Sequence, residues 1–84
     1  MFKKAMIIKS DDNIEYIIMS VIIKDGNEYA LANKFVKGEP TYEYIVFKQN
    51  DGKILMENDT NVLNELLPLF QKEIDNDLKK INNN

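Results

Sequence analysis

The sequence predicts an α+β fold in which an antiparallel sheet of four to five strands is packed by one C-terminal amphipathic helix. Two observations predict it. Up to residue 57, runs rich in isoleucine, valine and tyrosine alternate with turn-forming pairs such as Asp-Gly, which is typical of β-hairpins. After residue 60 the apolar residues recur at three- and four-residue spacing, the period of one helix face. The 84 residues of the chain, 1–84, suit a single domain.

The predicted strands cover residues 4–9, 14–24, 28–36, 41–49 and 53–57. β-branched residues dominate the second of these runs, and they favour a strand over a helix. The pairs Asp25-Gly26 and Asp51-Gly52 each separate two such runs, which predicts two hairpins. Between the hairpins, residues 37–40 contain Gly38 and Pro40, so we expect a second kind of connection there.

The register of the first hairpin follows from which residues must be buried together. The odd positions form the more apolar sets, Ile17, Met19, Val21 and Ile23 in one strand and Tyr29, Leu31, Asn33 and Phe35 in the next. A three-residue loop ending at Gly26 places both sets on one face, whereas a two-residue loop places them on opposite faces. We therefore predict the three-residue loop, with Val21 opposite Tyr29 and not opposite Ala30. The same turn chemistry predicts a three-residue loop ending at Gly52.

One face of the predicted helix carries Val62, Leu63, Leu66, Leu67, Phe70, Ile74, Leu78 and Ile81. Asn58, Asp59 and Thr60 precede this stripe and are candidates for the N-cap. Pro68 lies inside it, where proline removes one main-chain hydrogen bond and crowds the carbonyl of Asn64. We therefore expect a kink at Pro68, or two helices that meet there. The tail over residues 82–84 is expected to be disordered.

Several residue types on which catalysis and metal binding depend are missing. The chain has no histidine and no cysteine, which removes the usual general base, the usual nucleophile–base pairs and the commonest transition-metal ligands. Its three glycines are isolated turn residues, so there is no glycine-rich phosphate loop. A calcium loop with Gly52 at its sixth position would begin at Phe47, which cannot ligate a cation. We expect a protein that is not an enzyme and holds no cofactor or metal.

Charge and hydropathy restrict the partners and the compartment. With 14 acidic and 11 basic residues the net charge is −3, and there is no basic stripe of the kind that nucleic acids require. The apolar runs are far shorter than the roughly 20 residues of a membrane-spanning helix. The N-terminus also lacks the long apolar core of a signal peptide, and a cysteine-free chain suits a reducing compartment. We expect a cytoplasmic protein that does not bind a membrane, and its charge argues against a nucleic-acid partner.

Six residues are candidates for an interaction surface: Tyr16, Ile18, Tyr42, Tyr44, Leu78 and Ile81. Tyr42 and Tyr44 lie two apart and therefore share a sheet face. Such tyrosines can stack on single-stranded nucleic acid, but Glu39 and Glu43 beside them favour a simple packing role.

The strand 14–24 is apolar on both faces, with Tyr16 and Ile18 on the even side. One helix covers only one face of a sheet, so the other face needs another cover. A second copy of the chain would supply it, and the apolar end of the helix at Leu78 and Ile81 offers that copy a further contact. The pattern therefore favours a homodimer.

Three segments carry a family resemblance: Asp-Asp-Asn-Ile-Glu-Tyr at 11–16, Lys-Asp-Gly-Asn-Glu-Tyr-Ala-Leu at 24–31, and Glu-Tyr-Ile-Val-Phe-Lys-Gln-Asn-Asp-Gly-Lys at 43–53. In this order they resemble the YrzB-like domains of unknown function, a small family of low-GC Gram-positive bacteria. The resemblance extends over about residues 6–74 and implies hairpins followed by a helix, in a bacterial or phage cytosol. It implies no activity, and this chain is less acidic than the family pattern.

Three hypotheses of function remain. The leading one is a non-enzymatic protein-interaction or regulatory module that binds another protein through the sheet edge or the helix. The first alternative is a phage-encoded inhibitor of a host protein or defence system, since a small acidic chain can occupy a basic channel of its target. The second alternative is a small sheet protein that binds single-stranded nucleic acid.

Overall fold

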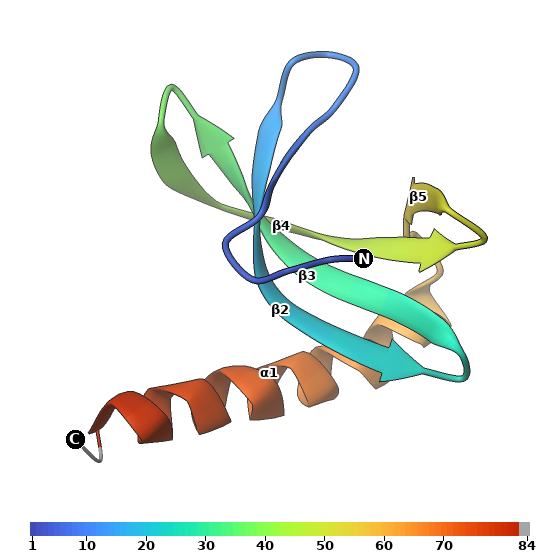
Figure 1. Cartoon of the computed structure of the whole chain (residues 1–84), viewed down its shortest axis with the longest axis vertical. Coiled ribbons are helices and arrows are strands. Elements are labelled where there is room, and N and C mark those ends of the chain that lie inside the picture. Colours follow the sequence, from blue (N-terminus) through green and yellow to red (C-terminus); the bar gives the residue numbers. More distant parts are fainter. Residues whose placement is uncertain (83–84) are drawn as a thin grey trace.

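The structure, a computed structural model, describes the main chain of residues 1–82 and the side chains of residues 1–80. Its elements are β1 (Ile7–Lys9), β2 (Glu15–Lys24), β3 (Asn27–Val36), β4 (Glu39–Asn50), β5 (Lys53–Met56) and α1 (Thr60–Asn82). The strands form one antiparallel sheet in the order β1-β2-β3-β4-β5, which curls into a half-barrel with α1 packed against it (Figure 1). The predicted α+β fold is confirmed.

All three tight connections of the sheet are two-residue loops in which both residues have positive φ. They are Asp25-Gly26 (53° and 78°), Lys37-Gly38 (52° and 79°) and Asp51-Gly52 (53° and 79°). This is the type I′ turn, whose twist matches that of the flanking strands, and glycine at the second position adopts it without strain. The three-residue loops predicted at Gly26 and Gly52 are therefore wrong. In the first hairpin Val21 lies opposite Ala30, and in the last Asn50 lies opposite Lys53.

A β-bulge resolves the conflict between this loop and the burial pattern. Ser20 pairs with Leu31, whereas Ile18 pairs with Ala32, so Met19 is left out of the ladder. Beyond this bulge the pairing changes parity, and Ile17 lies opposite Asn33. The predicted pairing of odd with odd positions thus occurs only in the half of the hairpin that is distant from the turn.

The connection between β3 and β4 is shorter than the sequence suggests. β4 begins at Glu39, and Pro40 lies opposite Phe35 within the ladder. Asn33 lies opposite Tyr44, so residues 41–43 of β4 face a single residue of β3. This second bulge interrupts β4 between its two halves.

Both faces of the sheet are buried, by different parts of the chain. The helix face holds a cluster formed by Tyr29, Val46, Leu66 and Phe70, with Ile22, Leu31, Val62 and Leu63 against it. The opposite face, which we call the N-terminal face, holds Phe2, Tyr16, Ile18, Ala30, Ala32 and Phe47. The segment before β1 crosses the sheet on that side (Figure 1).

Phe2 closes the N-terminal face. Its ring stacks on Phe47 with 6.4 Å between the centroids, and its main-chain N–H donates to Glu28 Oε1 at 2.7 Å. Tyr16 meets Phe47 edge-on, at 5.5 Å. The second apolar face of β2 is therefore covered by the chain's own N-terminal segment. The expectation that this face needs a second copy is wrong.

Helix α1 starts at a side-chain cap and continues through its proline. Asp59 Oδ1 accepts hydrogen bonds from the N–H groups of Asn61 and Val62, at 2.9 and 3.4 Å. The helix is not split at Pro68. Pro68 and Asn64 are both exposed, so water can reach the carbonyl that proline leaves without a partner. The expected disorder of residues 82–84 falls on Asn82, which ends α1, and on residues outside the described range.

Candidate interaction site

The structure separates the six candidate surface residues into two groups. Tyr16 and Ile18 are buried in the core of the N-terminal face, so they are not accessible to a partner. Tyr42, Tyr44 and Leu78 are exposed, and Tyr42 is 99% exposed. The side chain of Ile81 lies outside the described side chains. Only the exposed group retains the accessibility that an interaction surface needs.

Tyr42 and Tyr44 differ in their surroundings although they lie two residues apart. Tyr42 belongs to the bulge at residues 41–43 and extends into solvent. Tyr44 follows the bulge, returns to the ladder opposite Asn33, and lines a groove between β4 and α1. The two tyrosines therefore do not form one stacking platform with Tyr16, which is buried.

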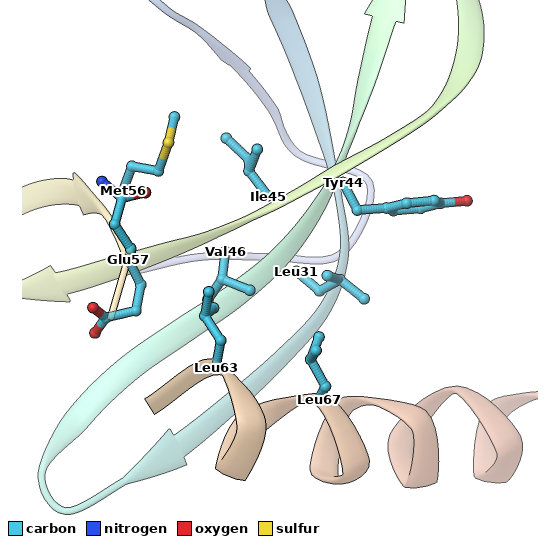
Figure 2. A pocket seen from close by; sticks show the side chains of 9 residues that line it. Leu31, Tyr44, Ile45, Val46, Met56, Glu57, Leu63 and Leu67 are labelled. Carbon is cyan, nitrogen blue, oxygen red and sulfur yellow. The ribbon is translucent and has the colours of Figure 1, made fainter. Parts of the chain in front are cut away.

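The groove lies on the helix face and has a volume of about 250 Å³. Its lining includes Leu31, Tyr44, Val46, Glu57, Leu63 and Leu67. Figure 2 shows Leu31 and Val46 of the sheet pointing toward Leu63 and Leu67 of the helix, with Glu57 at one end. The floor is therefore apolar, and Glu57 is the one charged residue among the described residues that line it.

Helix geometry determines which leucines form the groove. Leu63 and Leu67 are four residues apart and lie on the same side of α1. Leu66 is fully buried, whereas Leu67 is 48% exposed. Adjacent helix residues are about 100° apart, and with Leu66 directed into the core Leu67 lies at the edge of the apolar stripe. The sequence shows the stripe but does not show which of its leucines stays exposed.

Strand β5 provides a second exposed apolar surface. Ile54, Leu55 and Met56 are 44%, 60% and 48% exposed. They occupy consecutive positions of the last strand in the sheet, so side chains on both faces of β5 are accessible. The sequence marks this run as a strand but does not show that it lies at the edge.

The ion pairs among the described residues lie on the surface, outside the groove. Lys34 Nζ lies 3.0 Å from Glu43 Oε2, and this hydrogen bond raises the pKa of Lys34. Lys24 pairs with Glu65 across β2 and α1, which raises the pKa of Lys24 for the same reason. Among the described residues no group of three or more acidic side chains could hold a metal ion. The groove offers apolar contact and one carboxylate.

Comparisons with known proteins add no relative: no family model, no curated protein and no solved structure matches the sequence. Within residues 1–82, the one helix is not apolar enough to cross a membrane.

Proposed function

We propose that the chain is a non-enzymatic module that binds another protein in the cytosol, through the groove between α1 and strands β3 and β4. The observation that supports this proposal is the half-exposed pair Tyr44 and Leu67 above an apolar floor. Large apolar side chains of this kind anchor protein interfaces when a partner removes them from water. Leaving these apolar side chains exposed to water does not stabilise the monomer.

The chemistry of the groove indicates the chemistry of its occupant. A groove of about 250 Å³ with an apolar floor accommodates one or two large apolar side chains. Glu57 at its end favours a lysine or arginine next to those side chains, and the net charge of −3 also attracts a basic segment. We therefore expect a partner segment in which a large apolar residue is followed or preceded by a basic one.

A host-protein inhibitor would use the same groove and differ only in the identity of its partner. The nucleic-acid hypothesis is less well supported, since one of its three tyrosines is buried and the groove carries a carboxylate. A cradle for single-stranded nucleic acid combines basic and aromatic side chains.

Site-directed photo-cross-linking in the native host tests the proposal. A benzophenone amino acid replaces Tyr44, and the matched control carries it at Tyr42, which is exposed but does not line the groove. We expect a protein adduct from position 44 that is at least fivefold weaker from position 42. The identified protein, once purified, should bind at least tenfold more weakly to Leu67→Asp. Equal labelling from both positions, or unchanged binding to that variant, contradicts the proposal.

A further inference from the structure

The outer edge of β5 is unpaired among the described residues. Asn50 and Lys53 close the last hairpin, and the N–H of Glu57 donates to the carbonyl of Val46 at 2.8 Å. In an antiparallel ladder the main-chain groups of successive residues point alternately to the two sides. The main-chain groups of Lys53, Leu55 and Glu57 therefore point toward β4. Those of Ile54 and Met56 point outward, where no strand receives them.

We propose that two copies of the chain associate through antiparallel pairing of their β5 strands, about a two-fold axis at Leu55. In this arrangement Ile54 of one copy lies opposite Met56 of the other, and each pair exchanges two main-chain hydrogen bonds. The two sheets then continue into each other across the axis. Pairing by strand addition at a free edge is a common mode of association.

The outward groups determine the register. A bonded pair needs outward-pointing groups on both strands, so Ile54 or Met56 must face Ile54 or Met56. Pairing Ile54 with Met56 uses the outward groups of both residues on each strand. If Ile54 lies opposite Ile54 of the second copy, Met56 has no β5 residue opposite it. If Met56 lies opposite Met56, the same holds for Ile54. The first arrangement is therefore the favoured one.

This register makes the segment Lys53-Ile54-Leu55-Met56-Glu57 complementary to itself. Ile54 meets Met56 on one face, and Leu55 meets Leu55 on the other. Lys53 of each copy lies opposite Glu57 of the other, so opposite charges meet at both ends of the pairing. Apolar and opposite-charge pairs across an antiparallel ladder are each stabilising. An unrelated strand would not in general place a cation and an anion at these two positions.

The two-fold symmetry of the pairing limits this assembly to a dimer. Each copy's β5 edge is occupied by the other copy, so no β5 edge remains for a third copy. A four-residue strand makes a small interface, so we expect a weak dimer. Met56 and Glu57 of β5 and its C-terminal end also line the groove, whereas Lys53 and Leu55 do not. Lys53→Glu therefore tests the pairing without changing a groove residue, and Leu67→Asp tests the groove without changing β5, so the two proposals can fail separately.

Charge reversal with rescue tests the proposal on the full chain. Sedimentation equilibrium from about 10 µM to 1 mM should show the mass rising from 9.8 kDa toward twice that value. Lys53→Glu places like charges opposite each other and should weaken association at least fivefold, as should Glu57→Lys. The double variant Lys53→Glu/Glu57→Lys should restore it to within twofold. Lys37→Glu changes the net charge equally at another hairpin and should leave association unchanged.

The same samples give a second readout by amide hydrogen exchange. The N–H groups of Ile54 and Met56 should become protected as the concentration rises, while that of Tyr42 should not. A chain that stays at 9.8 kDa up to 1 mM overturns the proposal. So does a dimer that Leu78→Ser dissociates and Lys53→Glu does not, since that dimer would use the helix. A double variant no better than the single ones overturns it too.

Discussion

The side-chain amide of Asn33 donates a 2.7 Å hydrogen bond to the main-chain carbonyl of Thr41, across the bulge in β4. The same nitrogen donates to the carbonyl of Glu43 at 3.1 Å. Asn33 is buried, so its amide replaces the partners that these carbonyls lose where β3 and β4 fall out of register. These two hydrogen bonds stabilise the bulge at residues 41–43, after which Tyr44 lines the groove while Tyr42 extends into solvent.

Asn33→Ala should lower the free energy of unfolding by about 1–3 kcal/mol, because two carbonyls then lack a donor. Asn33→Asp should cost more, since a buried carboxylate would face two carbonyl oxygens. Urea denaturation followed by circular dichroism measures both. The matched control is Asn76→Ala on the exposed side of α1, which should be no less stable than the wild type. Equal stability of the Asn33 and Asn76 variants would contradict this role.

Ser20 is the opposite case, a buried polar side chain whose Oγ has no hydrogen-bond partner among the described residues. It pairs with Leu31 beside the bulge at Met19. Ser20→Ala removes an unsatisfied hydroxyl and should raise the free energy of unfolding by about 1 kcal/mol. The contrasting control is Thr41→Val. The Thr41 hydroxyl donates to the main-chain carbonyl of Lys34 at 2.8 Å, so its removal should lower the free energy of unfolding by about 1 kcal/mol. A stability loss in Ser20→Ala would indicate a bonded hydroxyl.

The course of the strands follows from local sequence, whereas their register does not. Alternating apolar residues and the pairs Asp25-Gly26 and Asp51-Gly52 predict the hairpins, and these form. Parity along a strand predicts register only where no residue leaves the ladder. Met19 leaves it, and its neighbours Ile18 and Val21 both pack on the N-terminal face despite opposite parity. Nothing in the local sequence marks this bulge, because burial on both faces of the sheet determines it.

The candidate site was only partly predictable for the same reason. Tyr44 and Leu78 are exposed as a surface residue must be. Tyr16 instead lies in the core, in one cluster with Phe2 and Phe47, which come from distant segments of the chain. A contact between distant segments cannot be read from periodicity. The exposure of Leu67 and of β5 depends on where α1 crosses the sheet and on which strand comes last.

Phe2 should be required for stability although it lies at the start of the chain. Phe2→Ala removes a buried ring from the N-terminal face and should cost about 3–5 kcal/mol. This is a large share of the stability of so small a domain. Phe2→Leu should cost less, and Lys3→Ala, at an exposed position, should change the midpoint of thermal unfolding little. If Phe2→Ala unfolds at the wild-type temperature, the segment before β1 does not contribute to the core.

The ion pair between Lys4 and Asp77 should make stability depend on pH in the acid range. Lys4 Nζ lies 2.6 Å from Asp77 Oδ2 and joins the N-terminal segment to the far half of α1. The hydrogen bond from Lys4 lowers the pKa of Asp77 below its ordinary value of 3.8. A carboxyl whose pKa is lower in the folded state stabilises the fold at pH values above 3.8, and this contribution disappears as the pH falls through the folded-state pKa.

Lys4→Met should therefore reduce the loss of stability between about pH 5 and pH 2, because Asp77 then has nearly the same pKa in both states. The effect should be small, since Lys4 is exposed and Asp77 is only partly buried, and it should shrink further in 1 M salt. Urea midpoints measured across this range check it, with Lys3→Met as the control of equal charge. Identical pH profiles for the two variants would mean that the Lys4–Asp77 contact does not persist in solution.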